Sequence, residues 1–254
     1  CARGLQDGHE EELAVTVTIE YVGSACFRIW REGGPVVVLD PYTPSAVGLP
    51  EISIQGDVVV ASSLIDAGHF CRELVAGDPD IVDALRVADG TPSEVDGSEV
   101  IAVPATEDPN HPDGPKDCAM YGLKIGGVAF AHMGDIGYAL GADELAPFRD
   151  RCDALLTLAG QTLTPSLEEL DEMIDFLRPT WIIPMHYYLE GMTADFEPVD
   201  EFLAHRSRDP ILLTRTTSVT LPLQRDDSGR PTIVVLEARG LDRPVRDLGP
   251  RESA

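Results

Sequence analysis

Three side chains of metal-binding type follow apolar, strand-like runs of this sequence. Asp66 follows a run of valines, Asp135 follows the second strand of an apolar hairpin, and His186 follows a third apolar run. Side chains at the carboxyl ends of buried strands point into the crevice where α/β folds place their chemistry. Each residue alone is equally well explained as a helix cap or a satisfied core group. Together, two carboxylates and one imidazole suit Zn²⁺, Fe²⁺ or Mn²⁺ and leave a coordination position open for water.

Other residues could complete this site or act on a bound water. His69 lies three residues after Asp66, on the same face if a helix begins there, and is the weaker ligand candidate. His111 and His132 could also approach. Asp66 itself, or Glu107 in a loop rich in Pro, Asp and Gly, is a candidate general base on water. The sequence therefore predicts either one divalent metal site or a pocket without metal.

The elements that must position these residues alternate along the chain. Strands come first, then strands alternate with helices, which suggests two sheets faced by helices on the outside in one domain of two halves. The boundaries are a tether at 1–13, the domain at 14–238 and a loose tail at 239–254. The periodicity predicts strands at 14–21, 26–30, 36–39, 58–60, 99–103, 120–125, 128–131, 154–158, 181–183, 217–223 and 232–236. It predicts helices at 78–85, from 143, from the Thr-Pro pair at 164–165 to 177, and at 199–205. The last two strands are expected to pair as a hairpin.

The composition excludes several classes of partner. The chain has 254 residues with 44 acidic and 19 basic side chains, for a formal net charge of −25. This field repels phosphate backbones and anionic lipid heads, so we expect no nucleic-acid partner. No stretch reaches the roughly 18 apolar residues of a transmembrane helix. The five cysteines show no metal or redox spacing. The remaining partner, a small molecule or a protein, is left open.

The first residue suggests a hypothesis about location. Cys1 is followed by a polar stretch at 2–12, as in bacterial lipoproteins whose mature form begins at a lipidated cysteine. This hypothesis anchors the protein to a membrane on the periplasmic or extracellular side through Cys1. The alternative is an arbitrary trimming point and a cytoplasmic protein.

Five short segments give the chain a resemblance to a known fold. They read YVGSACF at 21–27, VVVLDPY at 36–42, DVVV at 57–60, HMGDIG at 132–137 and IPMHY at 183–187. In this order and spacing the chain resembles the metallo-β-lactamase fold, and within it the branch of ascorbate-6-phosphate lactonase-like hydrolases. The resemblance implies an α/β fold, an αββα four-layer sandwich, with the site at one edge between the two sheets.

The chain departs from this family at its metal ligands. The H-x-H-x-D-H hallmark reads SSLIDA at 62–67, so only Asp66 of that motif remains. The family's next loop histidine falls on Glu107, and Ser24 replaces another histidine. By resemblance the first metal position is lost, while the second keeps Asp66, Asp135 and His186. A two-metal centre, which holds a hydroxide between two ions, is therefore not expected.

Three functions follow from this degenerate site. The favoured one is a binding or scaffold protein of the hydrolase fold without dinuclear activity. The alternative is a single-metal hydrolase of an ester, lactone or phosphoester that uses Asp66, Asp135 and His186. A third, with Ser62 or Ser63 as nucleophile, lacks an assigned histidine to activate the hydroxyl. Fold alone does not select the substrate.

Overall fold

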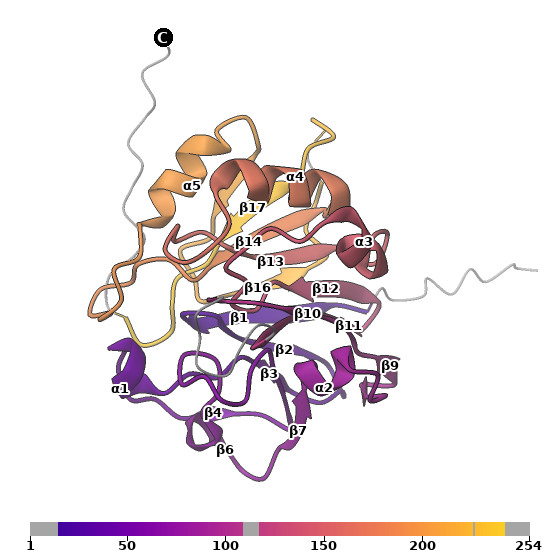
Figure 1. Cartoon of the computed structure of the whole chain (residues 1–254), viewed down its shortest axis with the longest axis vertical. Helices are drawn as coiled ribbons and strands as arrows, with labels where there is room; N and C mark the ends of the chain where they lie inside the picture. The colour runs from indigo at the N-terminus through magenta and orange to yellow at the C-terminus, as the bar shows by residue number, and fades with distance from the viewer. Residues whose placement is uncertain (1–14, 109–116, 226, 242–254) are drawn as a thin grey trace, which may run out of the picture.

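Two β-sheets stacked against each other form the centre of the molecule (Figure 1). The computed structural model describes residues 15–108, 117–225 and 227–241. Cys1, His111, the proposed tether and most of the proposed tail therefore lie outside the described residues. One continuous apolar core joins the inner faces of both sheets. It includes Ile19 and Phe27 from one sheet and Phe130 and Ile182 from the other, all with 0% exposure.

The first sheet has the strand order β16-β1-β2-β3-β5-β7. Its strands are β1 Val17–Gly23, β2 Cys26–Arg31, β3 Val37–Leu39, β5 Val58–Ala61, β7 Asp80–Asp83 and β16 Ser218–Leu221. The Gly33-Gly34 turn joins β2 to β3, and Gly33 has φ +69, a conformation that glycine adopts without steric cost. The strands β3, β5 and β7 are parallel. Because β3 and β5 are parallel neighbours, Asp40 and the loop that begins at Ser62 lie at the same edge of the sheet.

The second sheet has the order β10-β11-β12-β13-β14-β17-β15. Its strands are β10 Ile101–Ala105, β11 Cys118–Ile125, β12 Val128–His132, β13 Ala154–Leu158, β14 Trp181–Met185, β15 Ile211–Leu213 and β17 Thr232–Val235. The neighbours β12, β13 and β14 are parallel. Their carboxyl ends, which lead to Asp135 and His186, therefore meet at one edge.

Helices and small β-elements cover the outer faces and confirm the αββα sandwich. Figure 1 shows α3, α4 and α5 over the seven-stranded sheet and α1 on the side of the other sheet. Helix α2 follows β7 of the six-stranded sheet and packs against β10 and β11 of the seven-stranded sheet. The helices are α1 Pro44–Val47, α2 Ala84–Ala88, α3 Ala142–Leu145, α4 Leu167–Leu177 and α5 Val199–His205, with 3₁₀ turns at Arg72–Leu74 and Ala146–Phe148. The small elements are β4 Ile54–Gln55 with β6 Val75–Ala76, and β8 Glu94–Val95 with β9 Ser98–Glu99. None of the helices in the described part of the chain has the length and apolar character to span a bilayer.

Three expected elements differ from the structure. The helix predicted at 78–85 is wrong, because this stretch forms β7, and Asp83 then caps α2 by accepting from the amides of Leu85 and Arg86. The predicted hairpin between the last two strands is also wrong, because β16 pairs with β1 whereas β17 pairs with β14 and β15. Helix α4 starts later than predicted, at a capping box between Ser166 and Glu169.

Candidate metal centre

The loop after β5 brings Asp66 and His69 to the same side of one turn. The Asp66 carboxylate accepts a hydrogen bond from the amide of Gly68 at 2.8 Å, a local bond typical of Asp at turns. The amides of His69 and Phe70 donate to the Asp66 carbonyl at 3.1 and 2.8 Å. Asp66 keeps about a third of its side chain exposed (29%), whereas His69 is buried.

Asp135 and His186 follow the parallel strands β12 and β14. His186 has φ +54, an uncommon conformation for a non-glycine residue, and its amide donates to the carbonyl of Ser24 at 2.8 Å. Its ring centroid lies 4.4 Å from the ring centroid of the half-buried Phe196. His186 Nε2 lies 3.4 Å from Asp135 Oδ1. The packing therefore turns Nε2 of His186 toward the Asp135 carboxylate.

Two groups of potential ligand atoms meet at Asp135. In the first group, Nε2 of His69 lies 3.2 Å from Asp135 Oδ2, and one ligand atom each from His69, Asp135 and His186 lies within 4.8 Å of the others. In the second group, carboxylate oxygens of Asp66, Glu107 and Asp135 meet within the same limit. The structure therefore gathers Asp66, Asp135 and His186, the three residues singled out in the sequence, and adds His69 and Glu107.

Glu107 is held beside the cluster by its backbone. Its amide donates to the Asp117 carboxylate at 2.9 Å, and the amide of Gly137 donates to the Thr106 carbonyl at 2.9 Å. A Cβ at Gly137 would lie 1.8 Å from the Glu107 carbonyl oxygen, so only glycine permits this approach. Burial, and then the nearby carboxylates of Asp135 and Asp66, raise the pKa of Glu107 to about 7. Glu107 can therefore gain or lose a proton near neutral pH.

Asp40 is the residue of this site that sequence reasoning missed. Its carboxylate is fully buried and accepts hydrogen bonds from the Ser62 amide at 2.9 Å, the Ser62 hydroxyl at 2.5 Å and the Tyr121 hydroxyl at 2.8 Å. Nδ1 of His69 lies 2.6 Å from its Oδ2. A signal was available: an Asp directly after the apolar strand at 36–39 must find partners if it is buried.

The contact with Asp40 fixes how His69 faces the cluster. The Asp40 carboxylate can only accept a hydrogen bond, so Nδ1 of His69 carries the proton and donates it. The other ring nitrogen, Nε2, faces Asp135. Such carboxylate–histidine pairs orient the histidine ligands of metal sites. Burial acts to lower the pKa of His69, but the carboxylates of Asp135 and Asp40 outweigh it and hold this pKa well above its ordinary value.

His132 lies near the cluster but has a structural role. Its Nε2 lies 2.8 Å from the carbonyl of Ala25, and its Nδ1 accepts from the amide of Gly134 at 2.9 Å. Both ring nitrogens are therefore satisfied, with the proton on Nε2. Burial lowers the pKa of His132, which keeps the ring neutral. It has no free nitrogen to offer as a ligand.

The side chains present fit one divalent cation. Nε2 of His69 is buried without a hydrogen-bond partner among the described residues, although it lies 3.2 Å from Asp135 Oδ2. Buried polar atoms are rarely left unpaired, so each such atom calls for an explanation. Two imidazole nitrogens and a carboxylate are ligands that Zn²⁺ and Fe²⁺ take in proteins. A cation among His69, Asp135 and His186 would satisfy this nitrogen.

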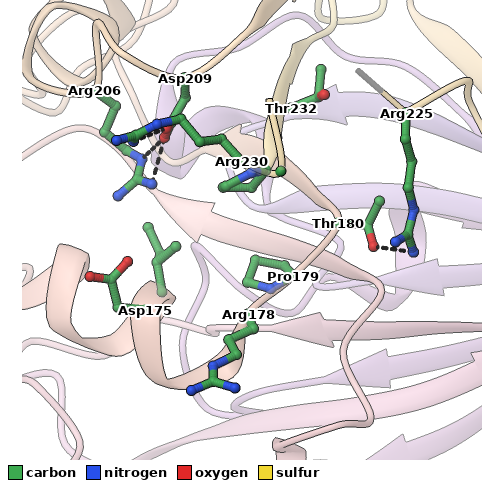
Figure 2. Close-up of a pocket in the computed structure, with 12 residues that line it drawn as sticks. Asp175, Arg178, Pro179, Thr180, Arg206, Asp209, Arg225, Arg230 and Thr232 are labelled. Carbon is green, nitrogen blue, oxygen red and sulfur yellow. Dashed lines mark hydrogen bonds and ion pairs between the residues drawn. The ribbon is translucent and has the colours of Figure 1, made fainter. Parts of the chain in front are cut away.

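A cavity of about 460 Å³ lies elsewhere, where β14 and β17 begin (Figure 2). Four arginines line it. Nε of Arg206 donates to Asp209 at 2.7 Å, Nη1 of Arg230 donates to the same carboxylate at 3.0 Å, and Arg225 donates to Thr180 at 2.8 Å. Thr180 precedes β14 and the metal cluster follows it. The length of this strand therefore separates the cavity from the cluster.

The fold has a cluster of metal-binding side chains at one edge of its two sheets, and comparison with known proteins gives the family. Residues 18–186 match the model of the beta-lactamase superfamily domain, and the chain belongs to this superfamily. Relatives named UPF0173 metal-dependent hydrolase include one from Pyrococcus abyssi, 24% identical over 77% of this chain and 96% of its own length. Another, from Pyrococcus horikoshii, is 25% identical over 67% and 84%.

Solved structures share the fold. A Thermotoga maritima protein assigned as a Zn-dependent hydrolase of the metallo-β-lactamase superfamily is 26% identical, with a TM-score of 0.64 over 87% of this chain and 98% of its own. A metallo hydrolase from Ignicoccus hospitalis, 19% identical, has a TM-score of 0.59 over 82% of this chain and 100% of its own. The second likeness concerns the fold alone.

Proposed function

We propose that this protein is a hydrolase that works with one divalent metal ion held by His69, Asp135 and His186. The observation that carries the proposal is the buried Nε2 of His69, which has no hydrogen-bond partner in the part of the chain that the structure describes. This nitrogen faces Asp135, while Asp40 holds Nδ1 at 2.6 Å. The names of the Pyrococcus relatives support metal dependence. Compared with the sequence prediction, His69 becomes a ligand and Asp66 becomes free for another role.

The remaining acids are placed to handle protons. A bound divalent ion supplies Lewis-acid activation of a water molecule and of the bond to be broken. Carboxylate oxygens of Asp66 and Glu107 lie within 4.8 Å of Asp135. Asp66 Oδ2 also lies 4.0 Å from Nε2 of His69, so either acid is placed to accept a proton from a water molecule at the cluster. Glu107 is the better candidate, because its pKa of about 7 lets it take up and return a proton at neutral pH. The substrate class consistent with this chemistry is an ester, a lactone or a phosphoester.

The residue types favour one ion over two. The second group consists of three carboxylates, which are oxygen ligands that suit Mg²⁺ and Mn²⁺ better than Zn²⁺. By resemblance, the motif imidazoles that would bind the other ion are replaced by Ser62 and Leu64, and its loop histidine by Glu107. Ser62 instead donates its hydroxyl to Asp40. Membership of the lactonase-like branch remains part of this proposal.

A second candidate is a binding protein of the same fold without catalysis. The observation that favours it is the chain of contacts from Asp40 through His69 to Asp135. Because the pKa of His69 is raised, a protonated imidazole can satisfy both carboxylates without any ion. The amount of bound metal therefore separates the two candidates.

Metal content after dialysis against a mild chelator tests the proposal. We expect one equivalent of Zn²⁺, Fe²⁺ or Mn²⁺ in the wild-type protein and none in His69→Ala or His186→Ala. His205→Ala is the matched control, because His205 contacts Asp171 in a helix-to-helix ion pair and no group of the cluster. Two equivalents would contradict the single-ion proposal, and none in the wild type would favour the binding protein.

A further inference from the structure

Several large apolar side chains are exposed on the loops that carry or adjoin the metal cluster. Seven large apolar side chains in the described residues are exposed, from 40% to 63%. Four of them, Ile65, Tyr138, Leu163 and Tyr188, lie on the loops that carry or adjoin the cluster. We call these four residues the apolar rim. Scattered single apolar residues on a surface are ordinary, but a group around one site indicates contact with a ligand or partner.

Chain connectivity places the rim at the site. Ile65 precedes Asp66, Tyr138 follows Asp135 by three residues, and Tyr188 follows His186 by two. These loops leave β5, β12 and β14 at their carboxyl ends. The two loops of the second sheet are close, since only β13 separates β12 from β14 and adjacent strands lie about 4.8 Å apart.

Leu163 belongs to the loop that leaves β13, and this loop is bound to the loop after His186. The Thr162 hydroxyl donates to the Asp195 carbonyl at 2.5 Å. The amide of Glu197 donates to the Gly160 carbonyl at 2.8 Å. Between these two bonds lies Phe196, whose ring packs on His186. Leu163, which is 63% exposed, is thus next to Thr162, which is hydrogen-bonded to the loop after His186.

The charges at the cluster restrict the polar part of the ligand. Asp66, Glu107 and Asp135 carry up to three negative charges, and the ion pairs of Asp66 and Asp135 within the described residues are with histidines. One divalent ion offsets two of these charges. The whole chain adds a net charge of −25. A phosphate or carboxylate group on a substrate is therefore repelled, whereas a neutral ester or lactone is not.

We propose that the substrate is a neutral ester or lactone with an aliphatic or aromatic group, and that Ile65, Tyr138, Leu163 and Tyr188 bind this group. The inference rests on the proposed hydrolase function and adds the substrate class to it. The reaction is a hydrolysis: water adds to the carbonyl carbon, the acyl C–O bond breaks, and the freed alkoxide oxygen takes up a proton. An ester gives an acid and an alcohol, and a lactone opens to one hydroxy acid. The apolar group takes no part in the chemistry. It favours substrate binding, because apolar surface on the group and on the rim is removed from water when they meet.

A chain-length series of p-nitrophenyl esters tests the proposal with the zinc-loaded protein. Each fully buried methylene favours binding by about fourfold. A rim that covers only part of the chain should give about tenfold higher kcat/KM for the octanoate than for the acetate. In the variant Ile65→Ser/Tyr138→Ser/Leu163→Ser/Tyr188→Ser we expect this ratio to fall to about two. Ile81→Ser and Leu212→Ser, exposed apolar residues on the edge strands β7 and β15, should retain the wild-type ratio.

A binding measurement separates this proposal from the proposed function. Octanamide, a neutral amide of the same length, is titrated calorimetrically into the wild type and the rim variant. If no ester is hydrolysed but octanamide binding weakens at least fivefold in the rim variant, the hydrolase proposal fails and the apolar subsite stands. A ratio that is unchanged in the rim variant would overturn the subsite. So would preferential hydrolysis of p-nitrophenyl phosphate, or a wild-type dimer that the rim substitutions dissociate in sedimentation.

Discussion

Nδ1 of His69 and Oδ2 of Asp40 lie 2.6 Å apart in a contact that solvent does not reach. Asp40 directly follows β3 of the first sheet, and its other oxygen accepts a hydrogen bond from the hydroxyl of Tyr121 on β11 of the second sheet. One carboxylate thus fixes the histidine of the metal cluster and also ties the two sheets together. Stability and metal binding should therefore depend on the same residue.

Asp40→Asn should impair both properties. The asparagine side chain lacks the negative charge, and its NH₂ group faces Ser62, Tyr121 or His69, which already donate hydrogen bonds to this position. Breaking a buried charged pair costs about 3 to 5 kcal/mol. Metal affinity should fall about 10- to 100-fold, as when other partners that orient metal ligands are lost. Urea unfolding in chelator and titration against a competing chelator measure the two effects. Asp96→Asn is the control, since the pair of Asp96 with the partly exposed Arg31 should contribute about 1 kcal/mol or less. Equal losses in both variants would contradict the role of Asp40.

The metal-free protein should lose stability as the solution becomes alkaline. Burial opposes protonation of His69, but Asp135 and Asp40 raise its pKa above the unfolded value of about 6.5. A raised pKa gives stabilisation that is complete below about pH 6.5 and is lost as pH rises through the folded pKa. The urea midpoint in chelator should therefore fall between pH 7 and 9.5, and less steeply in His69→Gln. A midpoint that rises over this range would show that His69 is neutral in the folded protein.

Glu107 should set the acid limb of the hydrolytic pH profile. Burial and the carboxylates of Asp135 and Asp66 raise its pKa to about 7, so the base form gains population, and kcat/KM rises, as pH increases through about 7. Glu107→Gln should lower kcat/KM about 10²- to 10⁴-fold, the usual contribution of a general base, and remove this limb. Rates measured from pH 5 to 9 with a neutral ester test it. If the limb persists in Glu107→Gln and disappears in Asp66→Asn, Asp66 is the base.

Local patterns in the sequence predicted the elements better than their pairing. The helix at 199–205 and the strand at 154–158 have the predicted bounds. The helix buries Val199, Phe202 and Leu203 at helical spacing, and the strand is a short run that is buried throughout. The stretch Asp80–Asp83 was predicted to be helical, yet it pairs with β5, which no local pattern reveals. Likewise β16 and β17 follow each other in the chain but join different sheets. Pairing depends on tertiary packing, which overrides local propensity.

The site shows the same division. Asp66, Asp135 and His186 follow strands whose ends the apolar runs mark, so their grouping at one edge could be predicted. The orientation of His69 could not, because it depends on Asp40, which is 29 residues away in the chain. His132 looked equally available in the sequence, but its two ring nitrogens are bonded to backbone groups. Only the three-dimensional structure separates a satisfied histidine from one with a free nitrogen.

Gly160 should be essential for the position of His186. A Cβ at this residue would lie 2.2 Å from the His186 carbonyl oxygen and 3.1 Å from its carbonyl carbon. These are backbone atoms, so rotating a side chain cannot relieve the clash.

Gly160→Ala should therefore shift His186, lower metal affinity at least tenfold, and destabilise the protein by about 1 to 3 kcal/mol, as overpacking does. Gly141→Ala is the matched control, because Gly141 has an ordinary φ of −76 and the nearest atom to its new Cβ is the flexible Glu144 Oε2 at 3.6 Å. Metal titration and urea unfolding of both variants measure the difference. Wild-type affinity in Gly160→Ala would show that His186 is not a ligand or that its loop shifts without loss.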